Sequence, residues 1–600
     1  MKKVKPIAWV ILCLPVLYAA IAAAAAYKQD TNLFDLMTRF SHVLKHPTLL
    51  HWTGYTPQCI IGALACYGLA VTLYYSGYEN RRPGEEYGSA KWGSVRALNK
   101  KYADPKGKNA ILTKRISIGL DGYRHQRNLN ILVVGGSGSG KTRYFCKPGI
   151  MSANCSYLVI DPKGEMLRST GRLLEQEKYD IKVFDLIHPQ QSDGYNPFTY
   201  IRDEPDVLKL MDNLVKNTTP PKGASNDPFW EKAEIALDSA LMLYLLSEAP
   251  KEEQNFEMLM FMLECARVME EDEQYQSPLD LLFQALEERE PNHVAVREYK
   301  VYKQAAGKTA KSILISCGAR LAPFDIPQLR EIMSYDELEL DRMGDRKTAT
   351  FFVISDTDST YNFLVALAFS QMFNLLCERA DNVHGGRLPH HVRVLWDEAA
   401  NTGQVPGLEK LVAVIRSREV SLVLLYQQLA QCKAIYDKHA ETILGNMDSV
   451  VFLGGREAST IKEISENWLG KATISMQTEG RSRGQSESYN QNTQRLGREL
   501  MTPSELATMP GDKCILQLRG LPPFFSKKYD LKQHPNYRYT AEADKTKNAF
   551  DLDKLINRRR RPGLNEVCEV YEAAVPEDAL TAEDEDILSY DDIDDPDAFV

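Results

Sequence analysis

The eight residues at positions 135–142, GGSGSGKT, have the composition and spacing of a phosphate-binding loop. They satisfy the pattern GxxxxGK[ST], in which glycines allow backbone N–H groups to turn toward phosphate oxygens. Lys141 would reach the β and γ phosphates, and the Thr142 hydroxyl would bind Mg²⁺. The apolar run before the loop, 129–134, predicts a buried strand. We therefore predict a site for ATP and Mg²⁺. Its loop residues are Gly135, Gly136, Ser137, Gly138, Ser139, Gly140, Lys141 and Thr142.

A second apolar run, 392–396, ends in the acidic pair Asp397 and Glu398. We predict that Asp397 belongs to the Mg²⁺ shell and that Glu398 activates the attacking water. The alternative is a strand that ends at a helix N-cap, which aspartate also favours. Asp161, at the end of the run 157–160, could be mistaken for the metal ligand. The pair fits better because it supplies both a metal ligand and a base.

Polar residues also flank the apolar run 420–425. Gln427 and Gln428 follow it and could sense the γ-phosphate, although a surface position is the alternative for both. Arg416 and Arg418 precede it, and one of them, preferably Arg418, could reach the nucleotide of a neighbouring subunit. Such an arginine finger is worth about 10³–10⁵ in rate in other enzymes. Solvated arginines are the competing interpretation.

Strand-like runs alternate with helical stretches, which predicts an α/β fold with a mainly parallel sheet covered on both faces. The expected strands are 129–134, 157–160, 181–186, 350–355, 392–396, 420–425, 450–453 and 514–518. Strand signals vanish between 204 and 345, where apolar residues recur at helical spacing. We therefore expect a nucleotide-binding domain built from 129–203 and 346–540. An all-helical insertion, 204–345, would interrupt it.

The first 78 residues have the pattern of a membrane anchor. The uncharged run 7–26 is 20 residues long, about 30 Å as a helix, which matches the hydrocarbon core of a bilayer. A second run covers 59–77. Basic residues at 2, 3 and 5 and at 81 and 82 place both ends in the cytoplasm, with the loop 28–57 outside. The predicted protein is therefore multi-pass, with its bulk cytoplasmic; a cleaved signal peptide is the alternative.

Charge is unevenly distributed. The juxtamembrane segment 79–128 carries 12 basic and 5 acidic residues, whereas 562–600 carries 14 acidic residues and no Lys or Arg. Without that stretch the net charge of −9 becomes +5, so the overall charge neither indicates nor excludes nucleic acid. We expect 541–600 to be an acidic, disordered tail. The polar segment 470–497 predicts a mobile loop or an exposed hairpin. The 11 cysteines include no CxxC, so neither a disulfide framework nor a zinc site is indicated.

Several phrases together resemble the type IV secretion coupling proteins, the TraG/TraD-type ATPases of conjugation. They are GSAKWGS (88–94), GGSGSGKT, YLVIDPKGE (157–165), YNPF (195–198), DPFWEKA (227–233) and VLWDEAAN (394–401). The resemblance covers about residues 1–535. It implies a RecA-like nucleotide domain with an all-helical insertion, arranged as a hexameric ring at the cell membrane. It also implies ATP-driven delivery of single-stranded DNA with its bound relaxase to the secretion channel proteins. Ser417 stands where the family has glycine before its arginine, which departs from the pattern.

Two other functions are compatible with the loop and the anchor. An FtsK-like pump for double-stranded DNA shares both, but normally has more membrane spans and a small C-terminal DNA-reading domain, for which the sequence has no candidate. A docking receptor would bind nucleotide only to stabilise its assembly and would not act as a motor.

Overall fold

Nine strands form one mixed sheet in the computed structural model, which describes residues 6–29, 32–76, 85–219, 228–269, 275–305, 307–482 and 488–556. The strand order is β13-β12-β9-β3-β8-β7-β4-β6-β5. The strands are β3 (Ile131–Val134), β4 (Ser156–Pro162), β5 (Asp180–Asp185), β6 (Thr348–Ile354), β7 (Val392–Trp396), β8 (Val420–Tyr426), β9 (Ser449–Phe452), β12 (Lys513–Leu518) and β13 (Phe524–Lys527). From β9 to β5 all neighbours are parallel, and β12 and β13 add two antiparallel strands at one edge. All eight expected strands are confirmed, and β13 is added to them.

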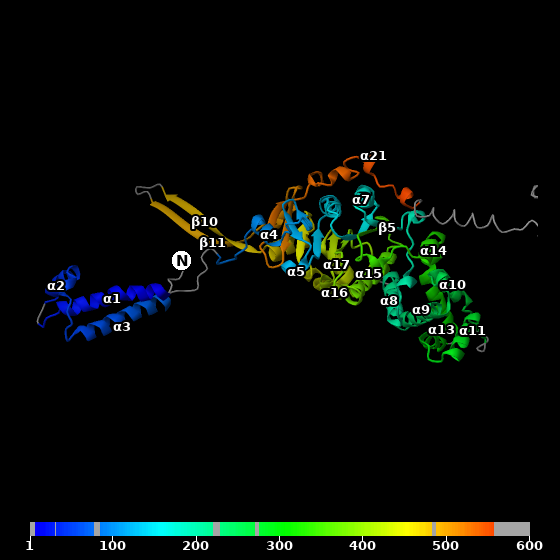
Figure 1. Ribbon diagram of the computed structural model, residues 1–600, viewed down its shortest axis with the longest axis horizontal. Coiled ribbons are helices and arrows are strands. Elements are labelled where there is room, and N and C mark those ends of the chain that lie inside the picture. Colours follow the sequence, from blue (N-terminus) through cyan, green and yellow to red (C-terminus); the bar gives the residue numbers. More distant parts are fainter. Residues whose placement is uncertain are drawn as a thin grey trace, which may run out of the picture. The chain divides into compact units, whose positions relative to one another are not determined.

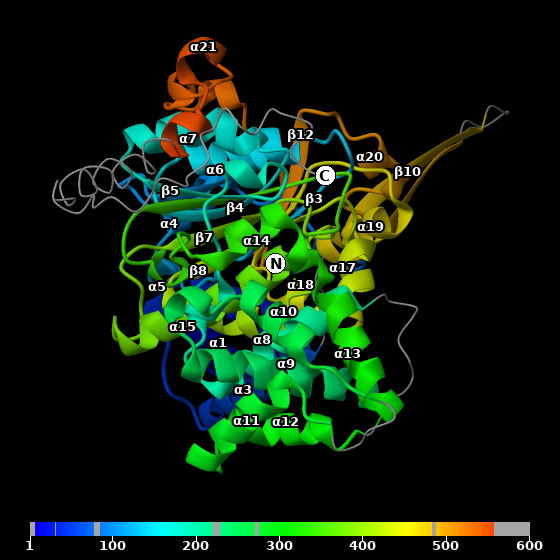
Figure 2. The same ribbon diagram turned by 90° about the vertical axis from the view of Figure 1, so that its right-hand side faces the viewer.

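Both faces of the sheet are covered, which explains why its central strands are continuous apolar runs. Every residue of β3, β7 and β8 is buried. Val133 belongs to the same apolar cluster as Leu167 on one face, and Val134 belongs to the same cluster as Phe369 on the other. Figure 2 shows the corresponding helices on opposite sides of the sheet. They are α6 (Lys147–Met151) and α7 (Glu165–Gln176) on one side and α15 (Phe363–Asn382) on the other.

Between Glu204 and Ser334 the described residues form helices and no strand. The α-helices are α8 (Glu204–Thr218), α9 (Pro228–Glu248), α10 (Phe256–Cys265), α11 (Pro278–Arg289), α12 (Val294–Lys303), α13 (Gly307–Leu321) and α14 (Pro327–Ser334). They gather beside the sheet in Figure 1 and share one apolar cluster with its α15 face. The chain therefore leaves the sheet after β5, builds a helical body, and returns at β6.

Part of the basic segment 79–128 folds against the sheet. It contains α4 (Val95–Tyr102) and an antiparallel pair, β1 (Asn109–Thr113) and β2 (Ile116–Gly119). Leu98, Leu112 and Ile118 are buried in the same apolar cluster as Val133. The structure divides the chain into one unit of 1–89 with 472–497 and another of 90–471 with 498–600, so the folded part of this segment belongs with the sheet.

The first unit contains two long apolar helices, α1 (Pro6–Ala26) and α3 (Thr56–Ser76). By length and composition both can cross a membrane. They pack together, since Tyr67 donates a hydrogen bond to the carbonyl of Trp9 at 2.5 Å and the two rings meet edge to face. The connection between them contains a further helix, α2 (Leu33–Lys45). The helix α15 also satisfies the length and composition criteria, but it covers the sheet.

The segment 470–497 forms a two-stranded sheet of β10 (Lys471–Ser482) and β11 (Ser488–Glu499), which confirms the hairpin interpretation. The basic residues before α1 and those at 81 and 82 lie outside the described residues. The same is true of residues 557–600 of the expected tail. The expectation of disorder from 541 onward is wrong for 541–556, because Phe550 is buried in the apolar cluster of Leu167 and the Ala541 N–H donates to the carbonyl of Ser169 at 3.1 Å.

Candidate nucleotide-binding site

The loop after β3 has the backbone geometry of a phosphate cradle. Gly138 and Gly140 have positive φ angles of 73° and 82°, a conformation that side chains other than glycine rarely adopt. A Cβ atom at Gly140 would lie 2.4 Å from the ring of Tyr144. The far side of the loop is fixed by a 2.9 Å hydrogen bond from the Gly136 N–H to the carbonyl of Gly454. A loop held in this way presents its N–H groups without further ordering.

Thr142 and Asp397 meet across 255 positions of sequence. The Thr142 hydroxyl donates to Asp397 Oδ2 at 2.8 Å. The contact follows from topology: β3 and β7 are parallel and separated only by β8, so the loops after both strands open at the same edge of the sheet. A hydroxyl beside a carboxylate is an oxygen donor set that suits Mg²⁺.

Burial raises the pKa of the Asp397 carboxyl above its ordinary value. Three interactions oppose this shift: the hydrogen bond from Thr142, the charge of Lys141, and a 3.1 Å hydrogen bond from the Glu398 N–H. A metal cation would stabilise the ionised carboxylate further. The site is thus a buried acid whose charge is balanced only in part by the protein.

Lys141 is buried and points back into its own loop. Its Nζ donates to the carbonyl of Gly135 at 2.9 Å, and its exposed fraction is 9%. The remaining N–H bonds of an ammonium can serve other acceptors, since a lysine has three. The side chain therefore lies where it can exchange a carbonyl partner for phosphate oxygens.

Glu398 is half-buried and has a strained backbone, with φ at +52°. Its Oε2 accepts a 3.0 Å hydrogen bond from Asn401 Nδ2. The carbonyl of Asn401 in turn accepts from Asn362 Nδ2 at 2.7 Å. This chain of amides fixes the carboxylate beside Asp397. Sequence reasoning assigned no role to Asn401, although it closes the motif VLWDEAAN.

The two glutamines after β8 differ in their surroundings. Gln427 is exposed at the carboxyl end of β8, which lies between β3 and β7, the strands that precede Thr142 and Asp397. Gln428 stands at the N-cap position of α17 (Leu429–Tyr436). Gln427 is therefore the better placed of the two to meet a bound phosphate.

The structure places Arg416 and Arg418 away from the other candidate residues. They precede β8, so they lie at the amino edge of the sheet. The seven residues of β8 span about 23 Å at 3.3 Å per residue, which separates this edge from the loop. Arg418 Nη2 is paired with Asp381 Oδ2 at 2.7 Å, whereas Arg416 has no ion pair within the described ranges. Neither arginine can reach the nucleotide site of its own chain.

Asp161 has a structural role. Its two carboxylate oxygens accept hydrogen bonds from the N–H groups of Met166 and Leu167, at 3.0 and 2.7 Å, in the first turn of α7. Burial raises the pKa of this carboxyl to about 7. The Asp161 carboxylate therefore binds the backbone N–H groups at the start of a helix.

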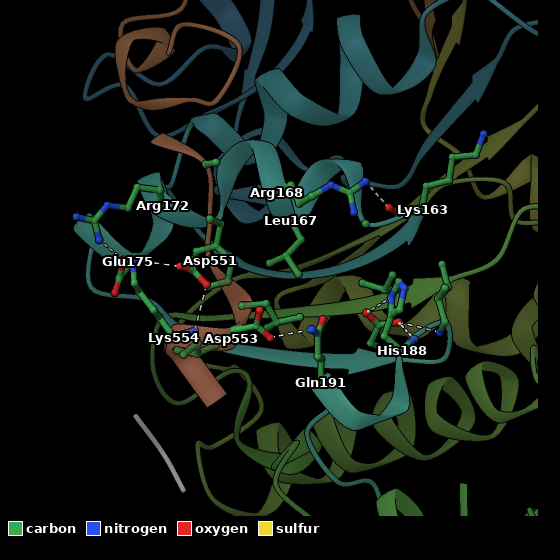
Figure 3. Close-up of a pocket in the computed structure, with 18 of the residues that line it drawn as sticks. Lys163, Leu167, Arg168, Arg172, Glu175, His188, Gln191, Asp551, Asp553 and Lys554 are labelled. Carbon is green, nitrogen blue, oxygen red and sulfur yellow. Dashed lines mark hydrogen bonds and ion pairs between the residues drawn. The ribbon is translucent and has the colours of Figure 1, made fainter. Parts of the chain in front are cut away.

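A cavity of about 720 Å³ lies near the carboxyl ends of β4 and β5, between α7 and the segment 546–555. Figure 3 shows several of its polar side chains bound to one another. Gln191 donates to Asp553 at 2.7 Å, and Lys554 pairs with Asp551 at 3.1 Å. Because these groups already satisfy one another, the loop after β3 is the better candidate for an anionic ligand.

Comparison with known proteins gives a matching family and similar solved structures. The family described as "Type IV secretory system Conjugative DNA transfer" matches residues 91–550. No curated protein matches the chain. Similar solved structures include the bacterial conjugative coupling protein TrwBdeltaN70 with sulphate, at 17% identity and a TM-score of 0.54, covering 76% of this chain and 97% of that chain.

Two further structures of TrwB carry nucleotides. The complex with the ATP analogue ADPNP is 15% identical, with a TM-score of 0.54, and covers 76% of this chain and 97% of that chain. The complex with ADP and Mg²⁺ is 16% identical, with a TM-score of 0.53, and the match covers 75% of this chain and 94% of that chain. At these identities the likeness concerns the fold, which is the expected RecA-like nucleotide-binding fold with its helical insertion.

Proposed function

The chain belongs to the type IV secretory system family of conjugative DNA transfer, and we propose that it is the membrane-anchored ATPase that couples DNA to the secretion channel. The observation that carries the proposal is the 2.8 Å contact between Thr142 and Asp397. It joins a phosphate loop to an acidic pair at one edge of a parallel sheet, where open α/β folds bind their ligands.

In this proposal the site holds ATP and Mg²⁺, which is supported by the TrwB complexes with the ATP analogue ADPNP and with ADP and Mg²⁺. Residues 135–142 bind the phosphates, with Lys141 on the β and γ groups. Thr142 and Asp397 hold Mg²⁺, which when bound neutralises phosphate charge. Glu398 orients a water molecule and accepts its proton, and Gln427 contacts the terminal phosphate, with Gln428 as the alternative.

We also propose that the protein works as a homo-hexamer in the cytoplasmic membrane. The spans α1 and α3 provide the anchor, and the bulk of the chain is cytoplasmic. The partners are single-stranded DNA with its relaxase and the proteins of the channel. A ring explains how an arginine at the amino edge of one sheet can meet a nucleotide at the carboxyl edge of the next.

The arginine finger can be identified by substitution. Arg416→Ala should lower turnover by at least about 10³-fold while ATP binding is retained, because a finger acts on the transition state. Arg418→Ala should lower turnover less, because the ion pair with Asp381 holds the Arg418 guanidinium within its own chain. Steady-state phosphate release and ATP titration of both variants provide the measurement. The reverse order would assign the finger to Arg418, and wild-type turnover in both variants would exclude it.

The function itself is tested by ATP hydrolysis of the full chain in detergent or nanodiscs, with and without DNA. We expect turnover that single-stranded DNA stimulates several-fold. Stimulation by duplex DNA alone would favour the FtsK-like pump. Nucleotide binding without turnover under any DNA condition would favour the docking receptor.

A further inference from the structure

The strand order sets the direction in which a bound nucleotide runs. On one side of β3 lie β8 and β7, which carry Gln427, Asp397 and Glu398 at their carboxyl ends. On the other side lie β9, β12 and β13. A triphosphate whose terminal phosphate faces the acidic pair must direct its nucleoside toward β9 and β13. This step rests on the proposed function, since it assumes that the loop holds a triphosphate.

Tyr144 stands beside the loop. It lies in the first turn of the helical segment that begins at Thr142, and its N–H donates to the carbonyl of Gly140 at 2.8 Å. Its ring covers Gly140, because a Cβ atom there would lie 2.4 Å from the ring. Side chains on a helix point toward its N-terminus, which explains this position. Tyr144 is half-buried as a residue, so part of it remains accessible.

The side chain of Lys528 reaches the phosphate loop and Tyr144 from β13, the strand at one edge of the sheet. It follows β13, where its N–H donates to the carbonyl of Asp512 at 2.9 Å. Its Nζ donates to the carbonyl of Ser139 at 2.8 Å and lies 5.4 Å from the centre of the Tyr144 ring. Lys528 is therefore positioned by β13 and bonded to the phosphate loop.

Lys528 is buried, which is uncommon for a lysine that is not paired with a carboxylate. Lys528 is only 7% exposed, and its Nζ has the carbonyl of Ser139 and no carboxylate as its partner in the part of the chain that the structure describes. Burial lowers its pKa. Ser139 uses one of its three N–H bonds, which leaves two for other acceptors. A buried donor with free N–H bonds next to an aromatic ring suits a ligand that has both a flat surface and hydrogen-bond acceptors.

We propose that Tyr144 and Lys528 form the nucleoside subsite of this ATPase. The ring of Tyr144 packs against the base or ribose of ATP, and Lys528 donates to an acceptor on the nucleoside while it holds the Ser139 carbonyl. The phosphates bind to residues 135–142 independently of this pair.

The test compares ATP with tripolyphosphate, which has the phosphates but no nucleoside. Calorimetric titration of the full chain with Mg²⁺ should show that Tyr144→Ala and Lys528→Met each weaken ATP binding by about tenfold, the scale of a lost stacking contact. Tripolyphosphate affinity should stay within about twofold of wild type. Tyr144→Phe should keep ATP affinity, because the ring remains. Lys527→Ala, an exposed neighbour, is the matched lysine control.

Three outcomes would overturn the assignment of the subsite. The first is an equal loss of affinity for ATP and tripolyphosphate, which would mean that Tyr144 and Lys528 only support the phosphate loop. The second is an unchanged affinity for ATP. The third is a loss of folding in both variants. Failure of the proposed function is distinguishable, because the wild-type chain would then bind neither ATP nor tripolyphosphate. Thermal unfolding of each variant without ligand shows whether the fold is kept.

Discussion

Replacing Lys141 with alanine should lower ATP turnover by at least about 10²-fold, the scale of losing one preorganised donor to transition-state charge. The side chain lies inside the loop with its Nζ on the Gly135 carbonyl, so its ammonium is positioned before the nucleotide arrives. Removing it leaves the β and γ phosphates without the cation that the loop itself supplies. Phosphate release at saturating ATP measures the effect, and titration with ATP shows the accompanying loss of affinity.

The control for this variant is Lys438→Ala, which removes an exposed lysine far from the loop in sequence. Its turnover should equal that of the wild type. Unfolding temperatures of both variants should lie close together, since Lys141 donates to a backbone carbonyl and is paired with no carboxylate among the described residues. Wild-type turnover in the Lys141 variant would show that residues 135–142 do not hold the hydrolysed nucleotide.

Changing Glu398 to glutamine should separate binding from hydrolysis. The amide keeps the size of the side chain and can still accept the hydrogen bond from Asn401, but it cannot take a proton from water. Loss of a general base lowers turnover by about 10²–10⁴-fold. ATP affinity should remain near the wild-type value because Lys141, Thr142 and Asp397 are intact. Single-turnover hydrolysis together with ATP titration provides the measurement.

Glu441→Gln is the matched control, since it makes the same change at an exposed position in α18 (Ala440–Gly445). It should hydrolyse ATP normally. If Glu398→Gln also hydrolyses ATP normally, Glu398 is not the base. If it loses ATP affinity as severely as the Lys141 variant, the residue has a structural role in holding the site.

Most of the sheet could be predicted from the sequence because its strands are buried on both faces. Such strands are continuous apolar runs, and Asp397 and Gln427 follow two of them directly. Parallel order then requires those residues to meet the loop that contains Thr142, although the chain separations are large. The pairing of loop and acid was thus predictable from local pattern together with one topological rule.

Other parts of the site depend on contacts that leave no local signal. Gln427 and Gln428 are equivalent in sequence, and only the start of α17 distinguishes them. The pairing of Arg418 with Asp381 depends on the position of α15. Lys528 is 389 positions from Ser139, and a lysine after a short edge strand is ordinarily solvated. These features come from tertiary packing.

The most direct test of the account is DNA transfer by cells whose only copy of this protein carries Glu398→Gln. The variant should be present in the membrane at the wild-type level, and transfer should fall to that of cells lacking the protein, since assembly and nucleotide binding remain but hydrolysis is lost. Transfer at the wild-type frequency would contradict the account, because DNA would then reach the channel without the reaction at this site.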